Sequence, residues 1–201
     1  VIAGAIYALV ALGFNLIYGA TKFFNLAHGV MAAIGGYSVF YFAKTLGWNL
    51  WLAVIIGVLL AGLIGYGLDK VIYKPLRKRK ASNMVLLVAS LGAFTALQAV
   101  IAILFTSQFR TLSFKVSTQN IYEIFGGVIT QTQLVILILA IVIMVGLALL
   151  LKYTMFGKAI KAISDDEEVA RIVGVNTNKI IGYVFFIGSA IAGLAGILVG
   201  F

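Results

Sequence analysis

The sequence predicts an all-α protein that crosses a membrane several times. Hydrophobic residues make up 63% of the chain and charged residues only 10%, and the mean hydropathy is +1.13. Soluble domains contain about half apolar and about a quarter charged residues, so this composition excludes an ordinary soluble fold. Apolar runs of about twenty residues recur along the chain, and a run of that length spans a bilayer as a helix. Lipid offers the backbone no hydrogen-bond partner, so we expect helices at these positions.

Six apolar segments are long enough to be transmembrane helices, at about residues 1–20, 23–43, 49–68, 83–106, 132–151 and 180–201. We expect them to form a single transmembrane domain over residues 1–201, with a charged cytoplasmic loop at about 152–179. The chain begins at Val1 and stops at Phe201 within apolar sequence. We therefore expect a fragment of a larger protein, incomplete at both ends.

The basic residues predict the orientation of the chain. Lys22, segment 69–82 and loop 152–179 together carry twelve of the 15 Lys and Arg residues, and they share one side of the membrane if the six segments alternate. Because basic residues concentrate in cytoplasmic loops, we assign that side to the cytoplasm and the 107–131 connection to the outside. This placement explains the net charge of +9 without a nucleic-acid partner.

Small residues recur every four positions in two spans, as Gly57, Ala61 and Gly65 in the third and Ala192, Gly196 and Gly200 in the sixth. That spacing places them on one helix face, where a second helix can approach closely, and we expect packing within one subunit. The pair Gly35-Gly36 in the second span has two interpretations. It marks either a broken helix beside a substrate path or a close-packing patch.

Acidic residues are absent from the apolar cores of the spans. All six lie at span ends or in connections: Asp69, Glu123, Asp165, Asp166, Glu167 and Glu168. Transporters driven by protons or sodium usually carry an ionisable group at membrane depth, so this distribution argues against ion-coupled transport.

Four polar residues in the first two spans are candidates for a translocation path, namely Asn15, Tyr18, Asn25 and His28. Asn25 and His28 are three residues apart and share a helix face. The single histidine either lines a polar cavity on the path or is a structural residue that bonds a neighbouring backbone group or Asn. One His without any Cys cannot complete a metal shell, so we predict no metal site. Nothing in the spans resembles a catalytic cluster, and we predict no catalytic residue.

The 152–179 loop contains a predicted short helix. Ser164 followed by Glu167 fits a capping box, and Gly174 is a plausible end of the helix. Val169, Ile172 and Val173 then form one narrow apolar stripe. A helix this short needs a surface to pack on, which is either a groove on a partner protein or the membrane surface or its own bundle.

Three stretches resemble one family: residues 4–19 (GAIYALVALGFNLIYG); Asn25-Leu26-Ala27-His28-Gly29 with Gly35-Gly36-Tyr37; and the loop from Gly157-Lys158-Ala159-Ile160-Lys161-Ala162 through Ala170 and Gly174-Val175-Asn176 to Ala190, Gly193 and Gly196. The spacer Tyr73-Lys74-Pro75-Leu76-Arg77 also fits. On these residues the chain is similar to the permease subunits of branched-chain amino acid ABC importers.

The resemblance implies that the loop is a coupling helix seated in a cleft of a cytoplasmic ATPase. The residues expected to carry this contact are Gly157, Ala159, Ala162, Asp165, Asp166, Val169, Ala170, Ile172, Val173 and Gly174. It also implies cytoplasmic ATP-binding subunits, a second homologous permease, an external substrate-binding protein, a lipid environment and a prokaryotic inner-membrane location. The substrate would be a branched-chain amino acid.

The chain itself is predicted to bind no cofactor. Its one Gly-Lys pair, Gly157-Lys158, is followed by Ala159 and lacks the first glycine of a phosphate-binding loop, so ATP and Mg²⁺ would be bound by a partner ATPase. Two alternatives remain open: an importer permease for urea or short amides, and a stand-alone secondary carrier or channel.

Overall fold

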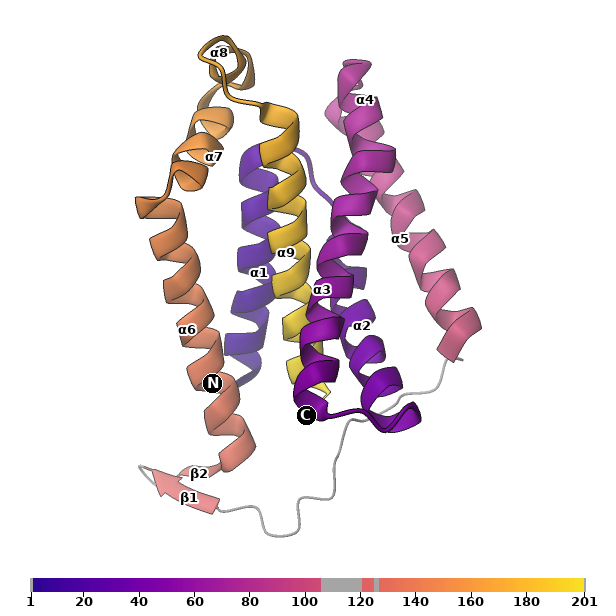
Figure 1. Ribbon diagram of the computed structural model, residues 1–201, viewed down its shortest axis with the longest axis vertical. Coiled ribbons are helices and arrows are strands. Elements are labelled where there is room, and N and C mark those ends of the chain that lie inside the picture. Colours follow the sequence, from indigo (N-terminus) through magenta and orange to yellow (C-terminus); the bar gives the residue numbers. More distant parts are fainter. Residues whose placement is uncertain (1, 106–120, 125–126, 201) are drawn as a thin grey trace.

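The computed structural model describes residues 2–105, 121–124 and 127–200. The helical elements are α1 (Ile2–Thr21), α2 (His28–Val39), the π-helix η1 (Phe40–Thr45), α3 (Leu50–Leu68), the π-helix η2 (Asp69–Tyr73), α4 (Lys74–Lys78), α5 (Asn83–Phe105), α6 (Gln131–Tyr153), α7 (Met155–Asp165), α8 (Glu167–Ile172) and α9 (Thr177–Val199). The long helices run side by side, and α4, α7 and α8 gather at one end of the bundle (Figure 1). The predicted polytopic helical fold is confirmed.

Within the described residues, five helices are long and apolar enough to cross a membrane: Ala3–Thr21, Leu50–Lys78, Asn83–Phe105, Gln133–Tyr153 and Thr177–Val199. The remaining predicted span corresponds to α2 continued by η1, which is one unbroken helical run over 28–45. The third span is longer than the predicted 49–68, because η2 and α4 extend it to Lys78.

The second predicted span was placed too early, at residue 23. Lys22 adopts a left-handed backbone with φ of 56°, which ends α1. Asn25 Oδ1 then accepts a hydrogen bond from the Ala27 amide at 3.2 Å, a local turn that delays the helix until His28. Residues 22–27 therefore form the connection between α1 and α2.

The 107–131 connection, predicted to lie outside the membrane, contains two short antiparallel strands that were not predicted from the sequence. Strand β1 (Ile121–Ile124) pairs with β2 (Gly127–Thr130), with Ile121 opposite Thr130. Residues 106–120 and 125–126 of this connection lie outside the described residues. Thr130 also begins α6 through a capping box with Gln133, whose amide donates to Thr130 Oγ1 at 3.3 Å.

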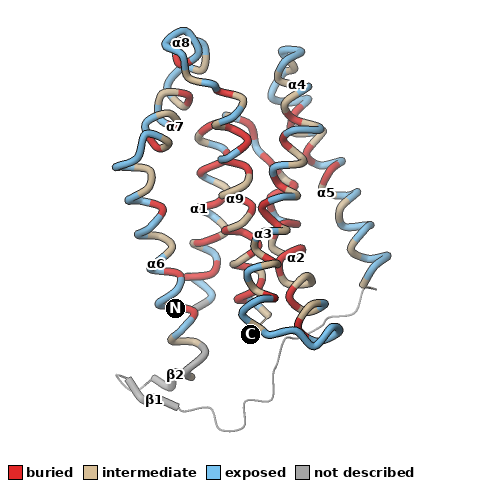
Figure 2. The backbone as a smooth tube through the Cα atoms, viewed as in Figure 1, coloured by how far each residue is buried: buried red, intermediate tan, exposed pale blue. Residues whose placement is uncertain are grey.

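Helix α9 is the centre of the bundle. It packs against α1, α2 and α3, and 61% of its span is buried, compared with 17–33% for the other four candidate spans. Figure 2 shows buried residues along α9 and its neighbours and exposed residues along α5 and α6. An apolar exposed surface on the outer helices is the expected face toward lipid.

Glycine contacts explain how closely α9 approaches its neighbours. A Cβ at Gly35 would collide with the backbone of Gly193, one at Gly196 with the backbone of Ala32, and one at Gly193 with the Ala61 side chain. The predicted packing of small residues within one subunit is confirmed. Gly35 and Gly36 belong to a continuous helix, so the structure supports the close-packing interpretation over the broken helix.

We expect Gly35→Leu to destabilise the protein strongly, because the added side chain has to displace the α9 backbone. Overpacking of a tight core costs about 1–3 kcal/mol, or more where the backbone must shift. Gly92→Leu on α5 is the matched control, because nothing lies within 4 Å of a Cβ there and the gain in helix propensity is the same. Thermal unfolding of the two purified variants measures the difference. Equal stability would contradict the packing analysis.

Candidate functional site

The region between α6 and α9, predicted to be a cytoplasmic loop with one helix, contains two helices. Helix α7 begins where Thr154 Oγ1 accepts a hydrogen bond from the Gly157 amide at 3.1 Å. Its inner face buries Ile160 and Ile163, whereas Lys158 and Lys161 are exposed. The amphipathic helix therefore lies against the bundle and carries a basic outer face.

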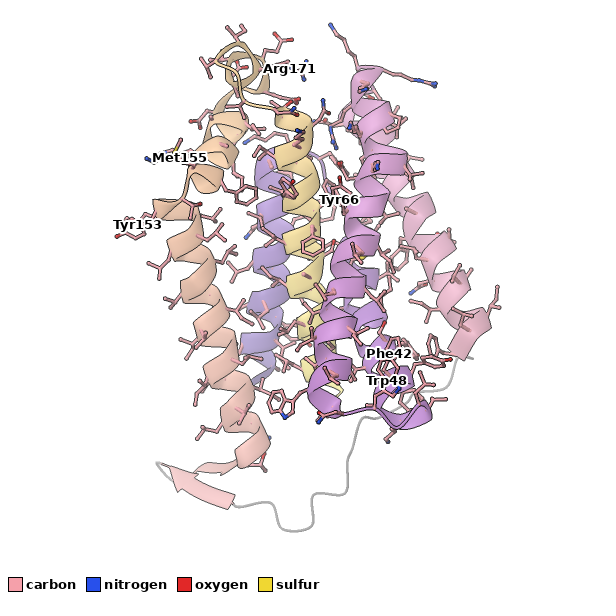
Figure 3. All side chains as sticks on the ribbon, in the orientation of Figure 1. Phe42, Trp48, Tyr66, Tyr153, Met155 and Arg171 are labelled. Carbon is pink, nitrogen blue, oxygen red and sulfur yellow. The ribbon has the colours of Figure 1, made fainter. Side chains whose placement is uncertain are left out.

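Gly157 is held against the end of α6. A Cβ at this position would collide with the backbone of Leu151, so the sharp junction between α6 and α7 requires a residue without a side chain. Ala162 is half-buried, and so is Ala159. Tyr153 and Met155, beside this junction, are exposed and point away from the bundle (Figure 3).

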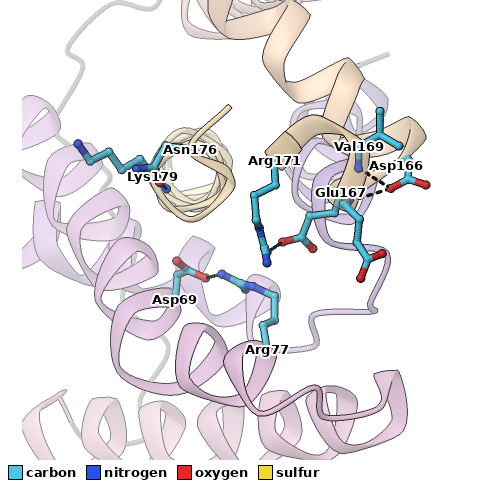
Figure 4. A network of polar contacts seen from close by, with 9 residues as sticks. Asp69, Arg77, Asp166, Glu167, Val169, Arg171, Asn176 and Lys179 are labelled. Carbon is cyan, nitrogen blue, oxygen red and sulfur yellow. Dashed lines mark hydrogen bonds and ion pairs between the residues drawn. The ribbon is translucent and has the colours of Figure 1, made fainter. Parts of the chain in front are cut away.

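The predicted capping residue of the second helix is corrected from Ser164 to Asp166. Ser164 lies within α7, and its hydroxyl accepts a hydrogen bond from Lys22 Nζ at 3.1 Å. Asp166 has an extended backbone, and its carboxylate accepts from the amides of Glu168 at 2.8 Å and Val169 at 3.0 Å (Figure 4). Asp165, the last residue of α7, is exposed.

Helix α8 ends as predicted at Gly174. The φ of Gly174 is +90°, a conformation that glycine adopts without strain. The Val175 amide donates to the Ala170 carbonyl at 3.0 Å and the Gly174 amide to the Arg171 carbonyl at 3.1 Å, which is a Schellman motif. Asn176 then caps α9 by accepting from the Lys179 amide at 3.2 Å. Helices α8 and α9 are thus joined by a short, hydrogen-bonded turn.

The predicted apolar stripe of α8 is exposed. Val169, Ile172 and Val173 are 55%, 83% and 71% accessible, although they are aliphatic. Ala170 on the opposite face is buried and anchors the helix. The stripe therefore does not rest on its own bundle. The one described ion pair of this region, Arg171 with Glu167 at 2.8 Å, is a surface pair within one turn of α8.

The four candidate path residues do not form one cluster. Asn25 and His28 are buried, at 3% and 2% exposure, whereas Asn15 and Tyr18 are exposed on the outer face of α1. Asn25 Oδ1 accepts hydrogen bonds from Tyr73 Oη at 2.9 Å and from the Ala27 amide. Asn25 therefore links the α1–α2 connection to η2.

His28 lies against α1. Its Nε2 is 3.2 Å from the Val10 carbonyl oxygen, which can only accept, so Nε2 carries a proton and donates. The Phe14 ring meets the imidazole edge-on, with centroids 6.0 Å apart. The bond from Nε2 to the Val10 carbonyl agrees with the interpretation of His28 as a structural residue. The Nδ1 atom is buried and is left without a hydrogen-bond partner among the described residues.

Sequence reasoning missed a buried ion pair within the third span. Arg77 donates to Asp69 Oδ1 at 2.7 Å, with side chains 11% and 2% exposed (Figure 4). Asp69 was placed at the end of the third span, but it lies inside the continuous α3–η2–α4 helix. Residues that pair along a helix are usually three or four apart, whereas Asp69 and Arg77 are eight apart. The only signal in the sequence was one acidic residue followed by a run of basic residues.

A group of three aromatic rings packs together at η2. Phe23, Tyr73 and Phe185 are buried together, with centroids 5.0 Å apart for Phe23–Tyr73 and 5.2 Å for Tyr73–Phe185. The three rings come from the α1–α2 connection, η2 and α9. Ser90 on α5 adds a polar contact by accepting from the Leu26 amide at 3.1 Å. The α1–α2 connection, η2, α9 and α5 are thus tied together at this end of the bundle.

The described residues contain no group of three His, Cys, Asp or Glu side chains that could hold a metal ion. The prediction of no metal site therefore stays a prediction for the whole chain. At the end of the bundle opposite α8, the rings of Phe42 and Trp48 pack in a tilted arrangement with centroids 5.2 Å apart (Figure 3). Aromatic residues favour both membrane interfaces, so these rings mark an interface and the predicted orientation stays a prediction.

A comparison with known protein families shows to which family the chain belongs. The chain matches the family described as the branched-chain amino acid transport system permease component, over residues 1–201. The chain belongs to this permease family. The predicted family is therefore confirmed, and so is a multi-pass protein of the prokaryotic inner membrane, which agrees with the five spanning helices.

Individual relatives carry the same designation. The chain is 31% identical to LivH, the high-affinity branched-chain amino acid transport system permease protein of Escherichia coli K12, over 98% of the chain and 67% of that protein. It is 27% identical to the Pseudomonas aeruginosa permease BraD over the same shares. A probable LivH of Methanocaldococcus jannaschii is 29% identical over 100% of the chain and 64% of that protein. No solved structure matches the chain.

We expect Asp69→Asn in this permease to lower stability by about 3–5 kcal/mol, because the buried Arg77 charge loses its partner. Glu167→Gln is the control: it removes the acid of an exposed pair that is worth about 0–1 kcal/mol. Thermal unfolding of each purified variant is the measurement. A loss for Glu167→Gln as large as that for Asp69→Asn would contradict the difference in burial.

Proposed function

We propose that the permease is the membrane subunit of an ATP-driven ABC importer that carries branched-chain amino acids by alternating access. The observation that carries the proposal is the exposed stripe of Val169, Ile172 and Val173 on a helix whose other face is anchored. Exposed aliphatic side chains at i, i+3 and i+4 are suited to a hydrophobic groove on a partner. We assign that groove to a cytoplasmic ATP-binding subunit, which would bind the ATP and Mg²⁺.

The connection to α9 supports a role for α8 in transmission. The Schellman turn and the Asn176 cap leave little slack between the two helices. Helix α9 in turn packs on α1, α2 and α3 through glycines, so it cannot shift without moving them. A displacement of α8 by nucleotide-driven closure of the ATPase would therefore reach the centre of the bundle.

A stand-alone carrier coupled to protons or sodium is the weaker proposal. Such a carrier needs an ionisable group that changes charge or binds an ion within the spans. Among the described residues, the acid inside a spanning helix is Asp69, and it is already paired with Arg77 at 2.7 Å. Energy from a separate ATPase fits this arrangement better.

The substrate class is proposed from the relatives and from the path residues. The curated relatives are named as branched-chain amino acid permeases. A leucine-like side chain needs no charged group along its path, and Asn25 and His28 supply only neutral hydrogen-bonding groups. An external binding protein and a second homologous permease would complete the importer.

We expect Ile172→Asp to weaken binding of the ATP-binding subunit by roughly tenfold or more, because a carboxylate would have to enter an apolar groove. Met155→Asp is the control, since Met155 is equally exposed but lies outside the stripe. Co-purification of the ATPase with each full-length variant measures the effect. Normal association of Ile172→Asp would sink the assignment of the stripe.

We expect His28→Leu to reduce substrate uptake at least tenfold while the ATPase remains bound, because the path loses a hydrogen-bonding group. Ser90→Ala, which also removes a buried polar group near the cytoplasmic end, is expected to keep most of the uptake. Uptake per assembled complex in proteoliposomes is the measurement. Equal losses in both variants would show that His28 acts only in packing.

A further inference from the structure

A cluster of basic residues between α3 and α5 is not used by the proposed coupling mechanism. We call it the basic hairpin, and it comprises Lys70, Lys74, Arg77, Lys78, Arg79 and Lys80. Arg77 is paired with Asp69. For the other five, the described part of the chain provides no carboxylate within ion-pair distance. Lys70, Lys78, Arg79 and Lys80 are exposed.

The loop between α6 and α9 differs from the basic hairpin in its balance of charges. Loop 152–179 holds five basic residues beside four acidic ones, whereas segment 69–82 holds six beside the single buried Asp69. Figure 1 places α8 and α4 at opposite edges of the cytoplasmic end. The acids of α8 therefore lie across the bundle from the basic hairpin, and its exposed cations Lys70, Lys78, Arg79 and Lys80 are available to anionic groups of another molecule.

The backbone holds three of these charges together at a turn. Arg79 follows the end of α4, Lys80 adopts a left-handed conformation with φ of 52°, and the Ala81 amide donates to the Leu76 carbonyl at 3.1 Å. The chain reverses there and enters α5 at Asn83. The turn thus presents Lys78, Arg79 and Lys80 as one compact cationic group.

The position of the basic hairpin along the bundle axis indicates that it lies in the headgroup layer of the membrane. Val71 on one side of the turn and Met84, Val85 and Val88 on the other are exposed aliphatic residues. Such side chains belong in the hydrocarbon, so the cationic groups lie immediately beyond its boundary. Lysine and arginine stems reach outward from that level to place their charges among phosphates.

We propose that the basic hairpin binds the phosphate headgroups of anionic phospholipids in the cytoplasmic leaflet. The exposed aliphatic residues of α3–η2 and α5 contact the acyl chains of the same lipids. Each basic residue close to an anionic membrane surface strengthens binding about fivefold. The bound lipids would hold the cytoplasmic ends of the third and fourth spans at a defined height beside the Asp69–Arg77 pair. This proposal concerns lipid binding and does not depend on the transported substrate.

The test compares lipid preference in two variants of the full-length permease within its assembled complex. The triple variant Lys78→Gln, Arg79→Gln, Lys80→Gln removes the charge, and Lys78→Arg, Lys80→Arg preserves it. Both are reconstituted in phosphatidylcholine bilayers with a graded share of phosphatidylglycerol. Native mass spectrometry then measures the ratio of the two lipids retained. We expect wild type and the arginine variant to retain phosphatidylglycerol preferentially, and the triple variant to lose that preference at least tenfold.

Three results would overturn the proposal. One is an unchanged preference in the triple variant, and another is an equal loss in the arginine variant. The third is release of the ATP-binding subunits with lipid preference unchanged, which would make the basic hairpin a protein interface. If the triple variant inserts in the wrong orientation, which labelling of Met155→Cys, exposed and outside the stripe, detects, the single variants Lys78→Gln and Lys80→Gln replace it. Each should lose about fivefold, and no loss would overturn the proposal as well.

Discussion

The close approach of α9 to α1, α2 and α3 is the constraint on which the rest of the structure depends. Burial of apolar side chains cannot drive helix association inside lipid, because lipid tails are as apolar as the side chains themselves. Contact between backbones then provides much of the attraction, and it requires residues without large side chains. Gly35 against Gly193 and Gly196 against Ala32 satisfy that requirement at successive turns of α9. The helices α5 and α6, which lack such contacts, are attached at the edges and remain largely exposed.

This constraint determines how the end of the bundle that carries α8 is organised. Because α9 is fixed in the bundle centre, the short turn before it fixes α8, and α8 presents its aliphatic stripe outward. On the other side of α9, Phe185 packs on Tyr73, which holds Asn25. A movement imposed on α8 and a rearrangement around Asn25 are thus connected through one rigid helix. The coupling proposed for α8 needs no additional hinge within the described chain.

The sequence predicted the spans and the ends of α8 with different success. Apolar length alone identifies a spanning helix, because the thickness of the bilayer sets it. Gly174 was predicted as a helix end because a left-handed residue there has few alternatives to glycine. The start of α8 was misplaced, since both Ser164 and Asp166 can cap a helix. The choice between them depends on a distant residue: Lys22 takes the Ser164 hydroxyl, and burial of Ile163 keeps the chain helical up to Asp165.

The buried polar contacts show where sequence reasoning ends in this permease. Asp69 and Arg77 are brought together by a π-helical segment, and the apolar run leading into it carries no mark of that change in pitch. Asn25 and His28 were predicted to share a helix face, but Asn25 lies in the turn before α2, and their partners Tyr73 and Val10 come from other helices. Pairing between helices is decided by which small residues meet, and a periodic pattern of glycines occurs on several spans at once. Only the three-dimensional arrangement shows that α9 is the helix against which those faces converge.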